Sequence, residues 1–430
     1  MDLTMSPREL LLASFKAAVA AADPLQIVPP QLPQPPGGRT LVVGAGKAAA
    51  SMALAVEQHW PANAPLEGTV ITRYGHGLLT NRIAVIEASH PVPDEAGEAA
   101  AKNILDATRR LGRDDLLLAL FSGGGSALLS LPAEGVSMAD LKAITRELLR
   151  CGATIQEINA VRKHLSAIHG GRLAAACKAS VLALLVSDVT GDAPTHIASG
   201  PCAPDPTTYQ DAIEILARYE CAVPRAVQEV LQRGLRGEIP ETPKPGDRLF
   251  TKTENRVIAS AHRSLEAAAQ FFAANGITAA ILGDSVTGEA REVAKVYAAL
   301  AREVKAHGCP WRAPVALISG GECTVTVRGR GRGGRCAEFL LSLVNELQGA
   351  EGIYGLACDT DGIDGSEDNA GAIAGPNSRQ RALNAGLSAE RSLADNDAYG
   401  FFSALGDLVV TGPTRTNVND YRVILVSGEP

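Results

Sequence analysis

The feature that most constrains the fold of this chain is a repeated order of segments: a short apolar run, a glycine-containing turn and then a helical pattern. The first such unit is the run 40–43, the turn 44–47 and an alanine-rich helical segment that ends near His59. The same order recurs along most of the sequence. Because strands that alternate with helices usually pair side by side, this pattern predicts an α/β fold with a largely parallel sheet.

The chain also divides along its length. An ordinary domain holds about 100–200 residues, so a chain of 430 residues suggests two or three domains. The proline-rich segment 238–245 interrupts the alternating pattern and is the best candidate for a linker. The order of strand, turn and helix then resumes, which predicts a second α/β domain after the linker.

Composition argues against several classes of function. The formal net charge of −7 makes nucleic-acid binding a poor expectation. The 8 cysteines show no C-x-x-C pairing, which indicates reduced thiols in a cytoplasmic protein rather than a disulfide framework or a zinc site. The sequence has no run of about 18 apolar residues and no signal-peptide pattern at its start, so neither a membrane span nor secretion is expected.

A basic, glycine-rich loop covers residues 328–335. It follows two strand-like runs, 314–318 and 324–327, and precedes a helix expected from about Cys336. Glycine lets the backbone approach an anion closely, and arginine adds forked donors that match phosphate oxygens. The loop therefore predicts a polyanion cradle, with a solvated basic hairpin tip as the alternative. Its arginines are Arg328, Arg330, Arg332 and Arg335.

A partial dinucleotide-binding fingerprint lies at the first strand-to-helix turn. Gly44, Gly46 and Ala49 match the pattern G-x-G-x-x-A. The acidic residue that such sites need about 20 residues later is missing, and Arg73 stands at the end of the next predicted strand. Lys47, inside the turn, is interpreted as a phosphate-directed cation, with a solvated helix lysine as the alternative.

A second glycine-rich loop, 122–126, follows the apolar run 115–121. Three successive glycines are more than a tight strand-to-helix turn needs, which indicates that a nucleotide or a substrate anion approaches the backbone there. The loop does not match the nucleophile elbow G-x-S-x-G. In open parallel sheets ligands bind at the carboxyl ends of strands, which is where these glycine-rich segments are expected to lie.

Carboxylates also follow predicted strands. Asp188 and Asp192 follow one strand, and Asp361 and Asp364 follow another. Oxygen ligands with few protein contacts suit Mg²⁺ on a nucleotide, whereas turn formation or capping is the alternative for each residue. The order D-x-D-x-x-D-G resembles a calcium loop, but the glutamate at its far end is missing, so a calcium site is rejected.

With these segments identified, the chain resembles the glycerate 2-kinase family, also called the MOFRL family, whose members are often named hydroxypyruvate reductases. One departure is that Cys336 and Ala337 replace the usual Asn and Gln of G-G-R-N-Q-E-F, and another is Arg415 in place of a frequent glycine. The matching segments, which cover nearly the whole chain, are G-A-G-K-A at 44–48, S-H-P-V-P-D at 89–94, S-G-G-G-S-A-L at 122–128, N-A-V-R-K-H-L-S at 159–166, S-D-V-x-G-D at 187–192, I-A-S-G-P at 197–201, S-G-G-E at 319–322, G-R-G-G-R at 331–335, T-D-G-I-D-G at 360–365 and T-G-P-T-x-T-N-V-N-D at 411–420.

The resemblance implies an α/β fold of two domains with the active site in an interdomain cleft. The first is a Rossmann-like, doubly wound N-terminal glycerate kinase domain at 1–240, and the second is a smaller α/β MOFRL domain at 250–430. It also implies a phosphotransferase that uses ATP and Mg²⁺ to phosphorylate D-glycerate at its 2-hydroxyl group, giving 2-phosphoglycerate and ADP.

The resemblance and the residues at the strand ends together predict roles for individual residues. Lys47 and Arg335 correspond to the lysine and arginine singled out in the family and are the expected catalytic cations. Asp188 and Asp192 are expected to act in catalysis by binding the metal or orienting the 2-hydroxyl group. The glycerate carboxylate needs a cation, for which Arg162 and Lys163 are candidates. The residues expected to bind the nucleotide are Gly44, Gly46, Ser122, Gly123, Gly124, Gly125, Ser126, Gly320, Gly321 and Glu322, and those expected to bind the metal are Asp188, Asp192, Asp361 and Asp364.

Two other functions stay open at this point. An NAD(P)H-dependent hydroxypyruvate reductase is motivated by the partial fingerprint and by Arg73. A non-catalytic phosphometabolite-binding module is the third hypothesis, although the acids at strand ends argue against it. We expect the partners to be a small-molecule substrate and a nucleotide, without nucleic acid or membrane, in the cytoplasm; a homodimer is left open.

Overall fold

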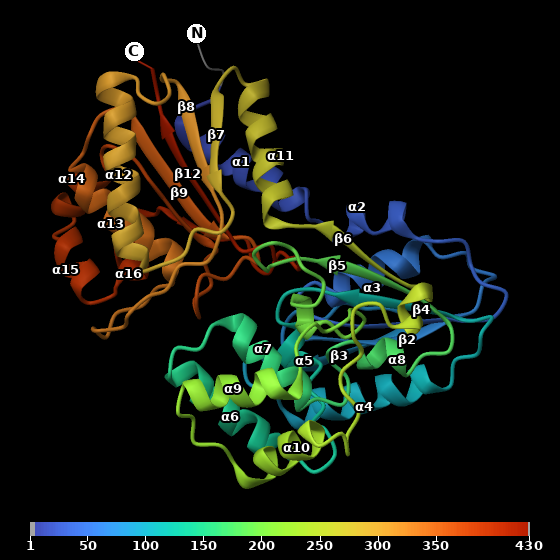
Figure 1. The fold of residues 1–430 in the computed structure, drawn as a ribbon. Coiled ribbons are helices and arrows are strands. Elements are labelled where there is room, and N and C mark those ends of the chain that lie inside the picture. Colours follow the sequence, from blue (N-terminus) through green and yellow to red (C-terminus); the bar gives the residue numbers. More distant parts are fainter. Residues whose placement is uncertain (1–4, 429–430) are drawn as a thin grey trace. The chain divides into compact units, whose positions relative to one another are not determined.

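The computed structural model describes residues 5–428, which form two compact units, each with its own sheet (Figure 1). The N-terminal unit covers residues 24–258. The C-terminal unit combines residues from 259 onward with residues 5–23. The two-domain α/β prediction is confirmed, and the C-terminal unit is the smaller of the two.

Two segments belong to a different unit from the domain that the sequence predicted for them. The strand β6 (Thr253–Ala259) extends the sheet of the N-terminal unit beyond the predicted end at residue 240. The first helix, α1 (Pro7–Ala20), belongs to the C-terminal unit and lies beside α11 (Ala261–Ala274), although the two are far apart in the sequence (Figure 1). The reason is apolar contact: Phe15 of α1 shares a buried core with Phe272.

The N-terminal sheet has the strand order β3-β2-β1-β4-β5-β6. From β3 to β5 the neighbours are parallel, with Thr40 paired to Leu66 on one side and to Leu116 on the other. This is the order of doubly wound nucleotide-binding folds and agrees with the Rossmann-like prediction. The central strands β1 and β4 are buried along their whole length, which accounts for their continuous apolar sequence. Besides β6, the unit has these strands and flanking helices: β1 (Thr40–Ala45), β2 (Leu66–Arg73), β3 (Ile83–Ala88), β4 (Leu116–Phe121), β5 (Ser180–Val186), α2 (Pro24–Ile27), α3 (Ala49–His59), α4 (Glu95–Arg109) and α5 (Gly125–Leu128).

A group of helices forms a second core in the same unit, made of residues such as Ile144, Val161 and Leu216. The chain leaves the helical conformation after His164 and forms an antiparallel bridge between Ser166 and Pro132. The next helix begins only after Gly170 and Gly171, whose φ values are +61° and +80°. The helices of this second core are α6 (Met138–Arg150), α7 (Ile155–His164), α9 (Tyr209–Arg218) and α10 (Arg225–Leu235). The short helix α8 (Arg172–Ala175) packs with the strands of the sheet instead.

The C-terminal sheet is mixed, with the strand order β11-β10-β9-β12-β8-β7. β7 and β8 are parallel, but β12 runs antiparallel to both of its neighbours, β8 and β9. The prediction of a largely parallel sheet therefore fails in this half of the chain. The strands are β7 (Thr278–Gly283), β8 (Val315–Ser319), β9 (Ile353–Asp359), β10 (Gly371–Ala374), β11 (Leu408–Val409) and β12 (Asp420–Val426).

Alternate residues of the central strands of this sheet enter two different cores. Leu317 and Ile424 pack with the helices α12 (Ala290–His307) and α13 (Arg335–Leu347). Ile318 and Val423 pack with α1 and α11 instead. The sheet is thus covered by helices on both faces, as the apolar strands require. Short helices complete the unit: α14 (Ser378–Asn384), α15 (Ala389–Ala394) and α16 (Ala398–Leu405).

The prediction of a strand over residues 324–327 is wrong. Only Thr324 forms a bridge, parallel to Glu289, and the rest of the segment is irregular. The reason is that the carboxylate of Glu289, rather than a neighbouring strand, accepts the N–H of Thr326 at 2.9 Å. The short strand β10 was not predicted.

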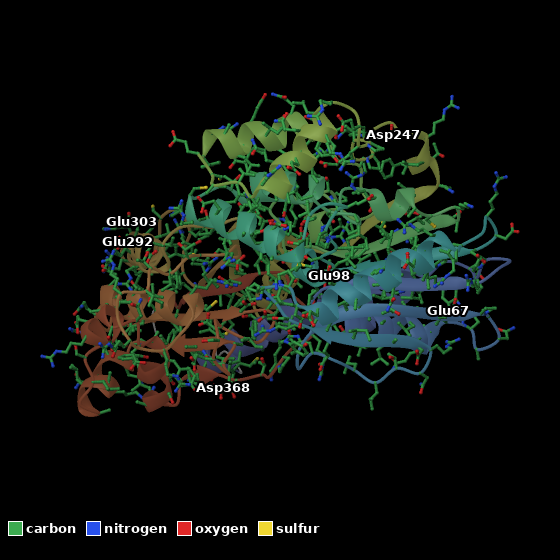
Figure 2. The ribbon with its side chains drawn as sticks, turned by 90° about the horizontal axis from the view of Figure 1, so that it is seen from below. Glu67, Glu98, Asp247, Glu292, Glu303 and Asp368 are labelled. Carbon is green, nitrogen blue, oxygen red and sulfur yellow. The ribbon has the colours of Figure 1, made fainter. Side chains whose placement is uncertain are left out.

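Acidic side chains are spread over the surfaces of both units. Figure 2 shows Glu98 on α4 and Glu292 and Glu303 on α12, as well as the loop residues Asp247 and Asp368. This distribution agrees with a moderate net charge of −7 that is not concentrated in one tract. Within residues 5–428 no single helix is long and apolar enough to cross a membrane, and only the bent pair Pro7–Ala20 and Pro24–Gln31 reaches that length and composition together.

Candidate active site

In the N-terminal unit, the turn after β1 is bound to the loop after β4. The backbone N–H of Lys47 donates to the carbonyl oxygen of Gly123 at 2.9 Å. The N–H of Ala48 donates to Oγ of Ser122 at 3.0 Å. The amides just before α3, which a dinucleotide enzyme offers to a pyrophosphate, are therefore occupied by protein acceptors.

The two glycines of the partial fingerprint are required by the same contact. Gly46 has φ +138°, and a Cβ there would lie 2.1 Å from Oγ of Ser122. A Cβ at Gly44 would lie 2.2 Å from the carbonyl oxygen of Leu120. Packing against β4 and its loop is thus sufficient to explain Gly44, Gly46 and Ser122, which the sequence had assigned to nucleotide binding.

The side chain of Lys47 lies beside Gly124 and His90. A Cβ at Gly124 would lie 3.6 Å from Cγ of Lys47 and 3.0 Å from Nε2 of His90. Gly124 also has φ +81°, in the region that favours glycine. The glycine therefore leaves room for both side chains, and the loops after β1, β3 and β4 converge on Lys47. The sequence did not single out His90 as a site residue, although it stands in the matching segment 89–94.

A chain of hydrogen bonds leads from the same loop to Arg162. The hydroxyl oxygens of Ser126 and Ser199 are 2.8 Å apart, and Oγ of Ser199 donates to Oδ1 of Asn159 at 3.2 Å. Nη1 of Arg162 donates to the same oxygen at 3.0 Å. Ser199 holds φ +58°, a conformation that non-glycine residues rarely adopt and that often marks functional sites. Ser126 is thus linked to Arg162 through two residues that the sequence had not assigned.

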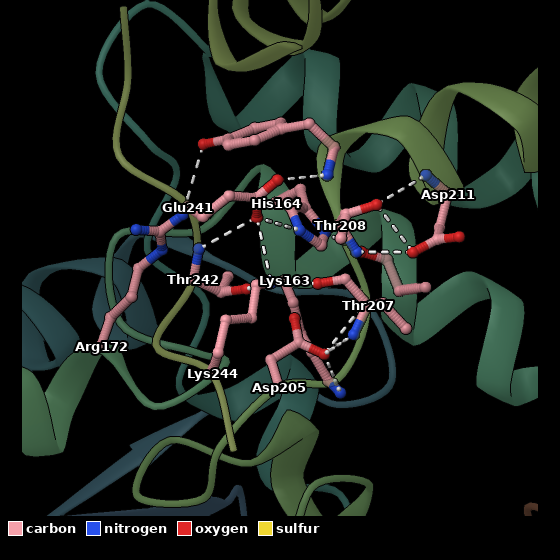
Figure 3. A network of polar contacts seen from close by, with 12 residues as sticks. Lys163, His164, Arg172, Asp205, Thr207, Thr208, Asp211, Glu241, Thr242 and Lys244 are labelled. Atoms are coloured by element: carbon pink, nitrogen blue, oxygen red, sulfur yellow. Dashed lines mark hydrogen bonds and ion pairs between the residues drawn. The ribbon is translucent and has the colours of Figure 1, made fainter. Parts of the chain in front are cut away.

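Lys163 belongs to a buried polar network (Figure 3). Its Nζ donates to Oγ1 of Thr195 at 2.8 Å and to Oδ1 of Asp205 at 3.2 Å. The side chains of Lys163 and Asp205 are only 1% and 0% exposed. Burial lowers the pKa of Lys163, and the charge of Asp205 opposes that shift. Because Asp205 already neutralises Lys163, Arg162 is the better of the two candidates for a substrate carboxylate.

His169 lies in this region with its side chain 1% exposed. Neither ring nitrogen has a hydrogen-bond partner among the described residues. Burial, together with the positive charges of Arg162 and Lys163, lowers the pKa of His169 to about 3. The imidazole is therefore neutral in the folded protein at physiological pH.

We expect His169 to make the fold less stable in acid. Between pH values of about 6.5 and 3, the unfolded chain binds a proton at this residue and the folded protein does not, so stability rises with pH. The free energy of unfolding should fall by about 2 kcal/mol between neutral pH and about pH 5 from this residue. Urea unfolding should show this loss in the wild type and in the exposed-site variant His307→Gln, but not in His169→Gln. Equal pH dependence in all three would contradict the buried neutral histidine.

In the C-terminal unit, Arg335 opens α13 and makes three ion pairs. Its nitrogens lie 2.7 Å from Oδ2 of Asp359, 2.9 Å from Oδ1 of Asp420 and 3.1 Å from Oε1 of Glu322. Burial alone would lower the pKa of Arg335, but the three carboxylates raise it. Asp359 and Asp420 are buried, whereas the side chain of Glu322 is 57% exposed. A ligand anion that reached Arg335 would therefore displace Glu322 most easily.

Asp364, predicted as a metal ligand, caps α13 instead. Its two oxygens accept the backbone N–H groups of Cys336 and Ala337 at 3.0 and 2.8 Å. Burial raises the pKa of Asp364 to about 7, although these two hydrogen bonds act to lower it. Oδ1 of Asp361, also a predicted metal ligand, accepts the N–H of Ile363 at 2.8 Å. Because the cap uses backbone amides, it tolerates the unusual residues at 336 and 337.

The segment after β8 is bound to the buried side chain of Arg422. Nη2 of Arg422 donates to the carbonyl oxygens of Gly320 and Gly321 at 2.7 and 3.0 Å. Gly321 has φ +98°, and a Cβ there would lie 2.3 Å from the backbone nitrogen of Val286. Packing thus requires Gly321, which the sequence had assigned to nucleotide binding, whereas a Cβ at Gly320 would lie 3.3 Å from the carbonyl oxygen of Asp420.

The glycine–arginine loop is also bound within its own unit. The N–H of Gly329 donates to Oδ1 of Asn396 at 3.0 Å. Arg332 forms an ion pair with Glu367, and its guanidinium carbon lies 4.4 Å from the ring centre of Tyr399. Since Arg332 and Arg335 both serve internal ion pairs, the structure does not favour a cradle of four arginines, and Arg335 is the arginine that the fold positions most firmly.

The described residues also limit how a metal could be held. Across residues 5–428, no three histidine, cysteine, aspartate or glutamate side chains are gathered so that they could hold a metal ion. Mg²⁺ on a nucleotide typically takes only one or two protein carboxylates and completes its shell with phosphates and water. Asp188 and Asp192, both partly accessible just after β5, fit that requirement, whereas the buried Asp361 and Asp364 do not.

Taken together, the structure defines a two-unit α/β protein with a lysine in the turn after β1 of one unit and an acid-paired arginine at the start of α13 in the other. Residues 10–232 match the family model DUF4147, described as a domain of unknown function, and residues 315–420 match the MOFRL family model. The glycerate 2-kinase of Pyrococcus horikoshii is 40% identical, over 91% of this chain and 88% of its own. The chain therefore belongs to the glycerate 2-kinase family that carries the MOFRL domain.

Two further relatives are similar over nearly their whole length. The crystal structure of glycerate kinase from Thermotoga maritima has a TM-score of 0.87 and 36% sequence identity, and the match covers 97% of this chain and 99% of that one. A protein of Agrobacterium vitis that bears the provisional name hydroxypyruvate reductase is 50% identical, over 98% of this chain and 95% of its own. The names of the relatives thus point to two different reactions.

Proposed function

We propose that this protein is a glycerate 2-kinase, a phosphotransferase that uses ATP to phosphorylate D-glycerate. In this reaction the oxygen at C2 forms a bond to the γ-phosphorus, the bond between that phosphorus and the β–γ bridging oxygen breaks, and ADP leaves. The hydroxyl proton passes to a carboxylate, for which Asp188 or Asp192 is suited. Membership in the family and the glycerate kinase names of its relatives support this function, which we place in the cytoplasm.

One observation favours the kinase over the reductase. Dinucleotide enzymes bind the pyrophosphate with free amides at the first helix N-terminus. In this protein the N–H groups of Lys47 and Ala48 donate to the loop after β4 instead. The turn therefore supports a charged side chain rather than a dinucleotide, and Arg73 in place of the ribose-binding acid agrees with this.

The proposed mechanism depends on placing positive charge around the phosphates, because phosphoryl transfer needs little covalent help from the protein. Lys47, held by the loops after β1, β3 and β4, neutralises charge on the transferred group. Arg335, oriented by Asp359 and Asp420, offers a second cation in the C-terminal unit, which can exchange Glu322 for a phosphate oxygen. Mg²⁺ supplies further charge neutralisation when bound with the nucleotide at Asp188 or Asp192.

A coupled assay tests this function directly. With ATP and Mg²⁺ present, adding D-glycerate to the purified protein should cause ADP release together with formation of 2-phosphoglycerate. Hydroxypyruvate should cause no loss of NADPH absorbance. The opposite pair of results would replace the kinase by the reductase, and stabilisation by ligands without any turnover would indicate a binding module.

A further inference from the structure

A cavity of about 350 Å³ lies within the N-terminal unit, beside the loop after β3 and the helices α5, α6 and α7. Its walls are mainly apolar and include Pro93, Ala127 and Leu141. The charged residues that line it are all basic, namely Lys142, Arg146 and Arg162, and no acid lines it. Such a cavity suits a small organic anion with an apolar part.

Arg162 is partly buried and has no ion-pair partner among the described residues. Its guanidinium donates to the amide oxygen of Asn159, and none of the described carboxylates forms an ion pair with it. Burial lowers its pKa to about 10. The adjacent Lys163, in contrast, has Asp205 as a buried counter-ion. Because a partly buried charge without a counter-ion reduces stability, an anion that binds from outside explains Arg162 best.

The cavity shares its walls with the loops around Lys47. Pro91, which lines it, directly follows His90, and the side chain of His90 lies beside Gly124. Ala127 lines it and directly follows Ser126, the first member of the hydrogen-bond chain to Arg162. A ligand in the cavity would therefore lie against the same loops that position Lys47.

We propose that this cavity binds the phosphoryl acceptor as a 2-hydroxy carboxylate, with the carboxylate on Arg162 and the remainder against the apolar walls. The planar guanidinium matches a carboxylate with two parallel hydrogen bonds. The apolar walls leave room beyond the three carbons of glycerate, so 2-hydroxy acids with an apolar third carbon are acceptors as well. The proposal rests on the kinase function and adds the acceptor class to it.

Calorimetric titration of the full chain with D-glycerate, without nucleotide, tests the anchor. Arg162→Met should weaken glycerate binding about 100-fold and raise KM for glycerate by a similar factor, with KM for ATP almost unchanged. Arg162→Lys should recover part of the affinity, which also shows that a loss is not due to misfolding. Arg150→Met, on an exposed side chain of α6 outside the cavity, should bind like the wild type.

The outcomes separate this inference from the function on which it rests. Turnover of glycerate with unchanged affinity in Arg162→Met would overturn the inference and leave the kinase function intact. Glycerate binding that depends on Arg162, without ADP release in the wild type, would support the cavity and overturn the kinase function. The wild type should also release ADP with D-2-hydroxybutyrate, and failure to do so while glycerate reacts would overturn the proposed acceptor class.

Discussion

The Arg335→Ala variant is expected to lose about 3–5 kcal/mol of unfolding free energy in addition to its turnover. In the wild type the guanidinium neutralises Asp359 and Asp420, whose side chains are 3% and 1% exposed. Removing the arginine takes away a positive charge that lies 2.7 Å from Asp359 and 2.9 Å from Asp420, although Arg422 stays 3.8 Å from Asp420. Because both carboxylates are buried, that loss is larger than the loss of a surface ion pair. Urea unfolding monitored by circular dichroism measures the change.

Two further variants separate the structural role of Arg335 from its catalytic role. Glu322→Gln removes only the exposed partner, whose side chain is 57% exposed, and should change stability by less than about 1 kcal/mol. Adding Asp420→Asn to Arg335→Ala should restore part of the stability, because the two residues are coupled, but none of the turnover. An Arg335→Ala protein as stable as the wild type would contradict the role given to the ion pairs.

The fold of the N-terminal unit could be predicted from the sequence because its sheet is buried on both faces. Continuous apolar runs such as 116–121 therefore marked the strands, and glycine turns marked their carboxyl ends. The same alternation in the second half hid the direction of β12, since an apolar run does not reveal whether a strand is parallel or antiparallel.

That missed direction explains one missed site residue. In a parallel sheet Asp420, at the start of its strand, would lie at the edge opposite to Asp359. Because β12 is antiparallel, Asp420 instead pairs directly with Asp359 in the sheet register, and both contact Arg335. Without information on strand pairing, the sequence could identify Arg335 but not the acids with which it forms ion pairs.

Glycine-rich motifs were the least reliable guide to contacts. Gly46 and Gly321 stand in segments that predicted anion binding, yet a Cβ at either would meet another part of the same unit. A glycine required for packing and a glycine required for a ligand look alike in sequence. The roles of Lys47 and Arg335 stay predictions, for which the structure gives a setting: Lys47 lies where three loops converge, and Arg335 pairs with Asp359 at the end of β9.

Lys47→Ala is expected to keep the fold and to lower the turnover number by about 100- to 1,000-fold. The turn is held by the backbone N–H of Lys47, which alanine retains, so the contact with Gly123 should persist. The ammonium group is expected to act on the charge of the transferred phosphoryl group, where a positioned cation contributes about 3–4 kcal/mol. The coupled ADP-release assay gives the turnover number, and thermal unfolding checks the fold.

Matched substitutions show whether the effect belongs to this position. Lys102→Ala removes an exposed lysine from α4 and should leave the turnover number unchanged. Lys47→Arg keeps a positive charge but changes its shape, so it should fall between the wild type and Lys47→Ala. If Lys47→Ala reacted at a near-normal rate with an intact fold, the lysine would be a solvated helix residue, and the phosphate-directed role of the first turn would be lost with it.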